Sequence, residues 1–171
     1  MKEQIHRHLN QLVGLRLTAT TRAANMECLK FGNFTEKNKA GRQMQIGEFA
    51  LHLQSSWRFT SETEILVGSL DLYEPVDEKA DYNEHFDWDK PNGNLRDIKL
   101  TELIRRQNLT VISVASDSFG GFDILFDNDI QLSVFPAYSK VDKYSEYWRL
   151  ITNKATGKSH FVVTGAGVLQ D

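Results

Sequence analysis

Apolar residues recur along this chain with two different periods, which predict helices alternating with strands. A first helix is predicted over residues 2–13, because apolar residues follow at helical spacing up to Gly14, where a helix commonly ends. These apolar residues are Ile5, Leu9, Leu12 and Val13. From Leu15 the period becomes two, which indicates a strand, and a second strand is predicted at about 26–31.

A longer alternation follows the polar stretch NFTEKNKAGRQ, which is predicted to be a loop. Residues 49–59 are predicted to form one strand with a buried face and a solvent-exposed face. Its core-facing residues are Phe49, Leu51, Leu53, Trp57 and Phe59. After a turn at SETE, the run ILVGSLDLY is predicted as the return strand.

The second half has a similar pattern after residues 74–94, which read as a long loop or linker. Residues 97–107 predict a second helix, with Asp97 as its N-cap. Strands are predicted at about 109–116, 121–127, 130–136, 146–152 and 160–168. The paired glycines in 117–121 predict a hairpin turn.

The two halves share landmarks in the same order, which predicts an internal repeat. Each half begins with a helix, and a strand that starts at a leucine follows it. The next strands carry, in order, the motifs Phe-x-Asn, Leu-x-[Leu/Val] and Trp-Arg-[Phe/Leu]. Each half ends with an apolar return strand that contains or precedes a glycine. We therefore predict an α+β domain of two tandem helix-plus-antiparallel-strand repeats, with a largely antiparallel sheet or open barrel. Pseudo-repeat 1 covers about 1–73, an acidic linker about 74–94, and pseudo-repeat 2 about 95–171. The alternative is that two helix-and-hairpin segments look alike once gaps are allowed.

Composition favours a globular protein that acts in the cytoplasm. The 171 residues are 40% hydrophobic and 25% charged, and the net charge of −3 provides no overall attraction to nucleic acid or anionic membranes. A single cysteine, Cys28, precludes an internal disulfide and fits a reducing compartment. The N-terminus is polar and no apolar run approaches the ~20 residues of a membrane span, so neither a signal peptide nor a membrane partner is expected.

The tripeptide Gly157-Lys158-Ser159 matches the end of a phosphate-binding loop, but its surroundings predict a hairpin turn. Such a loop needs a glycine where Thr152 stands, and a helix where a β-type run begins at Phe161. No nucleotide or other cofactor is therefore predicted. A metal is not predicted either, because His52 and His160 lie on strands of different halves. Cys28 is predicted to be a small buried residue rather than a nucleophile.

The pairs Trp57-Arg58 and Trp148-Arg149 are candidates for a binding role. Adjacent strand residues point to opposite faces, so buried tryptophans would direct both arginines outward. One interpretation is structural, with solvated arginines paired to cross-strand carboxylates. The other is an anion or partner site on the exposed sheet face, with one arginine from each half.

The linker is the second candidate surface. Seven carboxylates between residues 74 and 89 are interleaved with aromatic residues, a composition suited to a basic protein partner. The candidate residues are Asp77, Glu78, Asp81, Tyr82, Asp87 and Trp88. The alternative is a solvated linker whose aromatic residues fold back on the core.

Three stretches, FALHLQSSWRFTSETEILVGSLDLY, FDILFDND with QLSVFP, and YWRLITNKATGKSHFVVTGAGV, support a family resemblance. They resemble a family of small, mostly uncharacterised bacterial proteins with the pattern ALHLQxxWR…ILVGSxDLY. The resemblance transfers no catalytic residues. It implies an association, since small proteins of this kind often occur beside secreted toxins as immunity partners.

Two functions follow from these observations. The first is a non-enzymatic cytoplasmic protein that binds a basic protein partner, such as a toxin that it neutralises. The alternative is a small-ligand or anion-binding module with a site between the two repeats, using Arg58 and Arg149. A hydrolase would need a histidine or cysteine beside an acid in a cleft.

Overall fold

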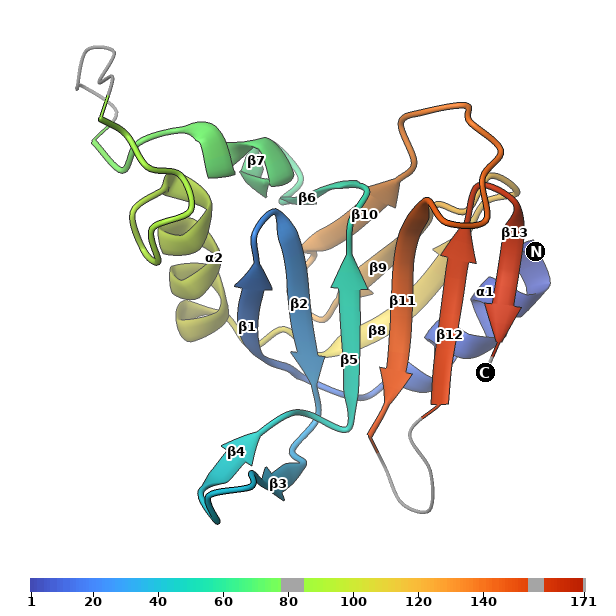
Figure 1. Ribbon diagram of the computed structural model, residues 1–171, viewed down its shortest axis with the longest axis horizontal. Helices are drawn as coiled ribbons and strands as arrows, with labels where there is room; N and C mark the ends of the chain where they lie inside the picture. The colour runs from blue at the N-terminus through green and yellow to red at the C-terminus, as the bar shows by residue number, and fades with distance from the viewer. Residues whose placement is uncertain (78–84, 154–158, 171) are drawn as a thin grey trace.

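The computed structural model describes residues 1–77, 85–153 and 159–170 and places most strands in two antiparallel sheets. A six-stranded sheet has the order β1-β2-β5-β11-β12-β13 and lies in front in Figure 1. Its strands are β1 Leu17–Ala23, β2 Met26–Phe31, β5 Phe49–Leu53, β11 Glu146–Thr152, β12 Ser159–Thr164 and β13 Gly167–Gln170.

A five-stranded sheet with the order β7-β6-β10-β9-β8 lies behind it (Figure 1). The two sheets share one hydrophobic core, in which the rings of Phe122 and Trp148 meet across the sheets at 4.9 Å. The strands are β6 Ser56–Thr60, β7 Ile65–Gly68, β8 Val111–Ser116, β9 Phe122–Phe126 and β10 Gln131–Phe135. The predicted α+β class and the antiparallel pairing are therefore confirmed.

The helices lie at opposite ends of the sheets (Figure 1). Helix α1, Lys2–Leu9, continues into the 3-10 turn η1, Asn10–Leu12, and packs on β8. Helix α2, Leu95–Arg106, packs on β1, β7 and the 3-10 turn η2, Ser69–Tyr73. Within the described parts of the chain, neither helix has the length and apolarity needed to cross a bilayer.

The N-cap prediction for α2 was wrong. Asn94 caps the helix, since its side chain accepts a hydrogen bond of 2.9 Å from the backbone N–H of Asp97. The carboxylate of Asp97 is thereby available to accept hydrogen bonds from Arg22 on β1.

The prediction of one strand over residues 49–59 was also wrong, because the chain passes from one sheet to the other at Gln54 and Ser55. The backbone N–H groups of both residues donate to the carbonyl of Tyr147, at 3.0 and 2.9 Å. Leu53 and Trp57 remain on the core side because both sheets face the same core. The alternation therefore continues without a break and does not reveal the change of sheet.

Three further boundaries differ from the predictions. The stretch predicted as a polar loop contains a hairpin, β3 Thr35–Lys37 and β4 Gln43–Gln45, whose side chains are all exposed. The predicted return strand ends at Gly68, where η2 begins, and the last predicted strand turns after Thr164. The Gly157-Lys158 turn lies outside the described residues, although the strands that flank it, β11 and β12, pair antiparallel as predicted.

The predicted hairpin turn at Asp117–Gly121 is confirmed. The carboxylate of Asp117 accepts hydrogen bonds from the N–H groups of Phe119 and Gly121, at 2.7 and 2.8 Å. A Cβ at Gly121 would lie 2.5 Å from this carboxylate, and Gly120 has a φ of +98°. Both glycines are therefore required by the turn.

Strands in corresponding positions of the two halves pair in matching registers. Leu17 pairs with Phe31, and Val111 pairs with Phe126, and an irregularity in register follows at the same place in each strand pair. Each half places its first strands in one sheet and its last strands in the other. Phe59 pairs with Val67 in the first half, and Leu150, at the same position of the second Trp-Arg motif, pairs with Phe161.

The starts of β1 and β8 are joined by a reciprocal pair of hydrogen bonds. Arg16 and Thr110 form an antiparallel bridge. Around it, Leu17 N–H donates to the carbonyl of Leu109 at 2.9 Å, and Val111 N–H donates to that of Leu15 at 3.0 Å. The two sheets are therefore connected at one corner.

Candidate functional site

The two candidate arginines lie on different sheets and are not brought together. Trp57 is 2% exposed and Trp148 is fully buried, so Arg58 on β6 and Arg149 on β11 face outward, as predicted. Because the sheets pack through a common core, their outward faces are on opposite sides of the molecule. Arg58 is exposed and lies 5.9 Å from the ring of Phe135.

Arg149 belongs to a polar group on the outer face of the six-stranded sheet. Its Nε donates to Glu146 at 2.7 Å, and its Nη1 lies 3.3 Å from Nδ1 of His160. His52 is its register partner on β5. Burial, and then the charge of Arg149, lower the pKa of His52 below its ordinary value. Arg149 thus lies between His52 and His160, where its charge opposes binding of a metal cation.

The candidate residues of the linker differ in their exposure to solvent. Asp77 and Asp87 are exposed, whereas Trp88 is half-buried and its ring lies 5.7 Å from that of Tyr73. Of the other candidates, Glu78, Asp81 and Tyr82 lie outside the described residues.

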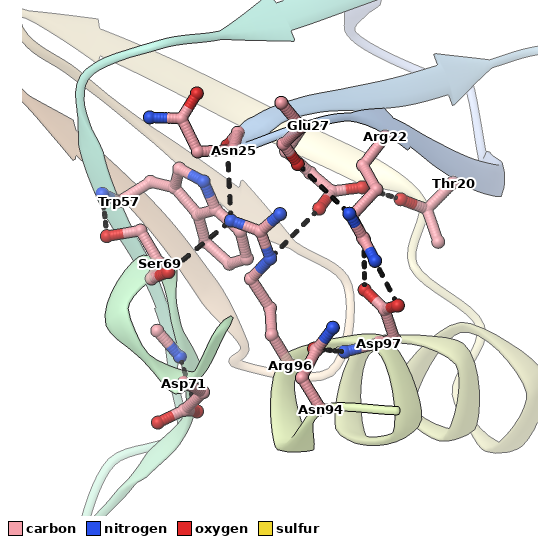
Figure 2. Close-up of polar contacts among 12 residues, drawn as sticks. Thr20, Arg22, Asn25, Glu27, Trp57, Ser69, Asp71, Asn94, Arg96 and Asp97 are labelled. Atoms are coloured by element: carbon pink, nitrogen blue, oxygen red, sulfur yellow. Dashed lines mark hydrogen bonds and ion pairs between the residues drawn. The ribbon is translucent and has the colours of Figure 1, made fainter. Parts of the chain in front are cut away.

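A buried ion pair, which was not predicted, lies where α2 meets the sheets (Figure 2). Arg96, in the first turn of α2, is 1% exposed, and Glu27 on β2 is 3% exposed. Nε of Arg96 lies 3.4 Å from Oε2 of Glu27, and its Nη1 donates to the carbonyls of Asn25 and Ser69. The guanidinium also lies 5.7 Å from the ring of Trp57. Nη2 has no hydrogen-bond partner among the described residues.

The burial of this pair perturbs both side chains. Loss of hydration raises the pKa of Glu27 above its ordinary value, although the hydrogen bond from Thr20 and the charge of Arg96 act in the opposite direction. Loss of hydration likewise lowers the pKa of Arg96. Carboxyl groups with raised pKa values occur often at binding and catalytic sites, which makes Glu27 a candidate.

Arg22 on β1 lies beside this pair and contacts Asp97 on α2 (Figure 2). Its Nε donates to both carboxylate oxygens of Asp97, at 2.9 and 3.1 Å. Its Nη1 donates to Asp89 and to the carbonyl of Ala24, and its Nη2 donates to the carbonyls of Trp88 and Asp89. The end of the acidic linker is thereby held against β1 and α2.

A cavity of about 450 Å³ lies between β1, the end of the linker and α2. This volume is in the range of small-molecule sites. Its charged lining consists of Arg22, Glu27, Asp89 and Asp97. The rest includes Thr20, Pro91, Leu100 and Thr101, so the wall combines hydroxyl and apolar groups. No group of three or more metal-ligating side chains is found in the described ranges.

The corresponding place at the other end of the sheets is apolar. At the charged end, Glu27 of β2 pairs in register with Leu53 of β5. At the other end, Phe122 of β9 pairs in register with Val134 of β10. Phe122 packs against Trp148 there. A charged pair therefore occupies one end where aromatic rings fill the other.

The sequence contains a signal for this pair in the phase of its two charged residues. Glu27 alternates in phase with the core residues Leu29 and Phe31. Arg96 lies in phase with Leu100 and Ile104, one and two helical turns away. A single charged residue on the buried face of a strand or helix needs a partner. Where a second element carries one opposite charge on its own buried face, the two predict a buried ion pair.

Comparisons of the chain with protein-family models, curated proteins and solved structures found no match.

Removing one member of the ion pair should cost much more stability than removing both. We expect Glu27→Leu or Arg96→Met alone to lower the free energy of unfolding by about 3–5 kcal/mol, because the remaining charge stays buried without its partner. The double variant should be about as stable as the parent protein, or more stable by about 1–4 kcal/mol. Urea denaturation measures all four proteins, and additive losses would contradict the coupling.

Glu27 should also make stability depend on pH. A carboxyl group whose pKa is raised on folding stabilises the fold fully below its unfolded pKa, and loses that contribution as pH rises through its folded pKa. We therefore expect the unfolding free energy to fall, relative to that of Glu27→Gln, as pH rises from the ordinary carboxyl pKa. Parallel urea titrations of both proteins test this, and a constant difference across the pH series would refute it.

Proposed function

We propose that this protein is a binding module whose ligand occupies the cavity between β1 and α2. The observation that supports this most directly is the buried carboxyl of Glu27 in the wall of a cavity large enough for a metabolite. Burying the carboxyl of Glu27 lowers the stability of the fold, because its ion pair only partly offsets the lost hydration. A role in ligand binding would explain why the charge is present despite this cost.

The location agrees with a site between the two halves of the chain. β1 and β2 come from the first half, α2 from the second, and the residues from Asp89 to Asn92 from the end of the linker. Arg58 and Arg149 have no part in this wall. The proposed site lies between the two halves, as expected from the sequence, but Arg22, Glu27, Asp89 and Asp97 line it in place of Arg58 and Arg149.

We further propose that the halves are tandem repeats of one ancestral unit. The matching registers and the reciprocal bridge at Arg16 and Thr110 support this. Under that proposal, the two ends of the core occupy equivalent positions and differ in chemistry, with Glu27 and Arg96 at one end and Phe122 beside Trp148 at the other. Apolar packing of similar volume usually stabilises a fold at least as well as a buried ion pair, so a requirement for binding gives a reason for the charged end.

Filling the cavity should abolish binding without disturbing the rest of the domain. A fragment library screened by ¹H–¹⁵N NMR should give hits that shift the amides of Thr20, Thr21, Leu100 and Thr101. The exposed Thr101→Trp change on α2 should abolish these shifts by occupying the space. Arg105→Trp, exposed on α2 outside the cavity wall, is the matched control and should retain them. Hits that persist in Thr101→Trp would refute the site.

A second candidate is the binding of a basic protein, in the manner of an immunity partner. The exposed carboxylates of Asp77 and Asp87 favour it, and so does the aromatic contact between Tyr73 and Trp88, the residue that follows Asp87. This surface lies on the linker and does not depend on the cavity being occupied.

Charge reversal tests the second candidate. If the product of a neighbouring gene is the partner, it should co-purify with this protein, and Asp77→Lys/Asp87→Lys should reduce that recovery at least tenfold through lost attraction and new repulsion. Glu62→Lys/Glu64→Lys, in the exposed β6–β7 turn, carries the same charge change and should have little effect. Equal losses in both variants would mean that net charge, not this surface, is responsible.

A further inference from the structure

We infer that the cavity between β1 and α2 takes an organic cation, an amine or a guanidine, with its positive charge held near Glu27. This inference rests on the proposed function and specifies the ligand class of the same site.

The charged groups around the cavity favour a cation. From β1 comes Arg22, from β2 Glu27, from the linker Asp89, and from α2 Asp97. One cation therefore faces three acidic groups. Arg96, which lies behind Glu27, adds a single further positive charge. With all of these groups ionised, one uncompensated negative charge remains, which a monovalent ligand would neutralise.

The hydrogen-bonding capacity of Arg22 argues against an anion. A guanidinium has five N–H donors, and those of Arg22 are directed to both oxygens of Asp97, to the carboxylate and carbonyl of Asp89, and to the carbonyls of Ala24 and Trp88. The cation in the wall therefore has no donor left for a carboxylate or phosphate ligand.

The acidic groups, in contrast, have acceptor capacity left. An ionised carboxylate offers about four lone-pair sites. Glu27 accepts from Thr20 and faces Arg96, and the side chain of Asp89 is 59% exposed. A ligand that donates hydrogen bonds matches this wall, and a positive charge strengthens each bond.

The remaining wall selects an organic ligand over a bare metal ion. Pro91, Leu100 and the methyl groups of the threonines provide apolar contact for a carbon skeleton. The acidic side chains do not converge into a metal-ligating group within the described parts of the chain. The cavity volume also exceeds what a single ion needs.

Binding should be linked to ionisation of Glu27. Burial raises the pKa of this carboxyl, and a cation beside it would lower that pKa again, because a neighbouring positive charge favours the ionised form. Ligand binding should therefore release protons. Calorimetry in buffers of different ionisation enthalpy measures that release.

The test uses probes with one carbon skeleton and different charge: butylamine, butylguanidine, butanol and butyrate. We expect the amine and the guanidine to shift the amides of Thr20, Thr21, Leu100 and Thr101 saturably, with affinity at least tenfold above that of butanol or butyrate. Glu27→Gln should reduce cation affinity by roughly tenfold or more and abolish proton release. Glu102→Gln, a carboxylate on α2 outside the cavity wall, is the matched control and should change neither.

Asp89→Asn provides a second variant that leaves the core intact, since Asp89 lies at the surface. It removes one acidic group and weakens the acceptor for Arg22 Nη1, so cations should bind more weakly and butyrate more strongly. Preferential binding of butyrate to the parent protein would overturn the cation inference while leaving the binding module intact. Binding of none of the probes, together with no fragment hits at these amides, would overturn both.

Discussion

The carbonyl of Tyr147 fixes the passage of the chain between the two sheets. It accepts hydrogen bonds from the N–H groups of Gln54 and Ser55 and from the hydroxyl of Ser55. Ser55 is 8% exposed, so these donors would cost free energy if they were left without an acceptor. The contact lies at the position where the register of β11 with β12 shifts, between Glu146 and Trp148. By holding β5 and β6 at their junction, it sets which residues of both strands reach the core.

The two ends of the resulting core use different chemistry. At one end Phe122, Trp148 and Phe161 form a contiguous aromatic cluster. At the other end Trp57 lies beside the guanidinium of Arg96, which faces Glu27. Apolar packing of similar volume usually stabilises a fold at least as well as a buried ion pair. Stability alone therefore does not account for the charged end, whereas a requirement for ligand binding would.

Much of the fold could be predicted from hydrophobic periods, because burial on one face gives a helix or strand a regular pattern. This pattern predicted the strands around Leu29, Ile124 and Leu150 and both helices, and the paired glycines predicted the Asp117 turn. The change of sheet at Ser55 could not be found, because residues on either side face the same core and keep the period of two. The β3–β4 hairpin was missed because all of its side chains are exposed, so no apolar pattern marks it.

The candidate site was harder to predict than the fold. The Trp-Arg pairs gave the correct facing of Arg58 and Arg149, but sequence order alone does not tell which sheet each strand joins. Asp97 was assigned to a cap, whereas Asn94 does this and Asp97 contacts Arg22 from 75 residues away. Contacts of that kind depend on how α2 lies on β1, which local patterns do not encode. The phase of Glu27 and Arg96 within apolar faces was the one local sign of the cluster.

The bridge between Arg16 and Thr110 has a consequence for how copies of the protein meet one another. β1 and β8 are edge strands of their sheets, and free edge strands are templates for pairing with another chain. Around the bridge, the starts of these two edges satisfy each other's backbone groups across the corner. Beyond it, Arg22 places a charge on β1, while α2 and α1 pack against β1 and β8. The corner that joins the two halves thus also protects one edge of each sheet, β1 and β8, from edge-to-edge pairing.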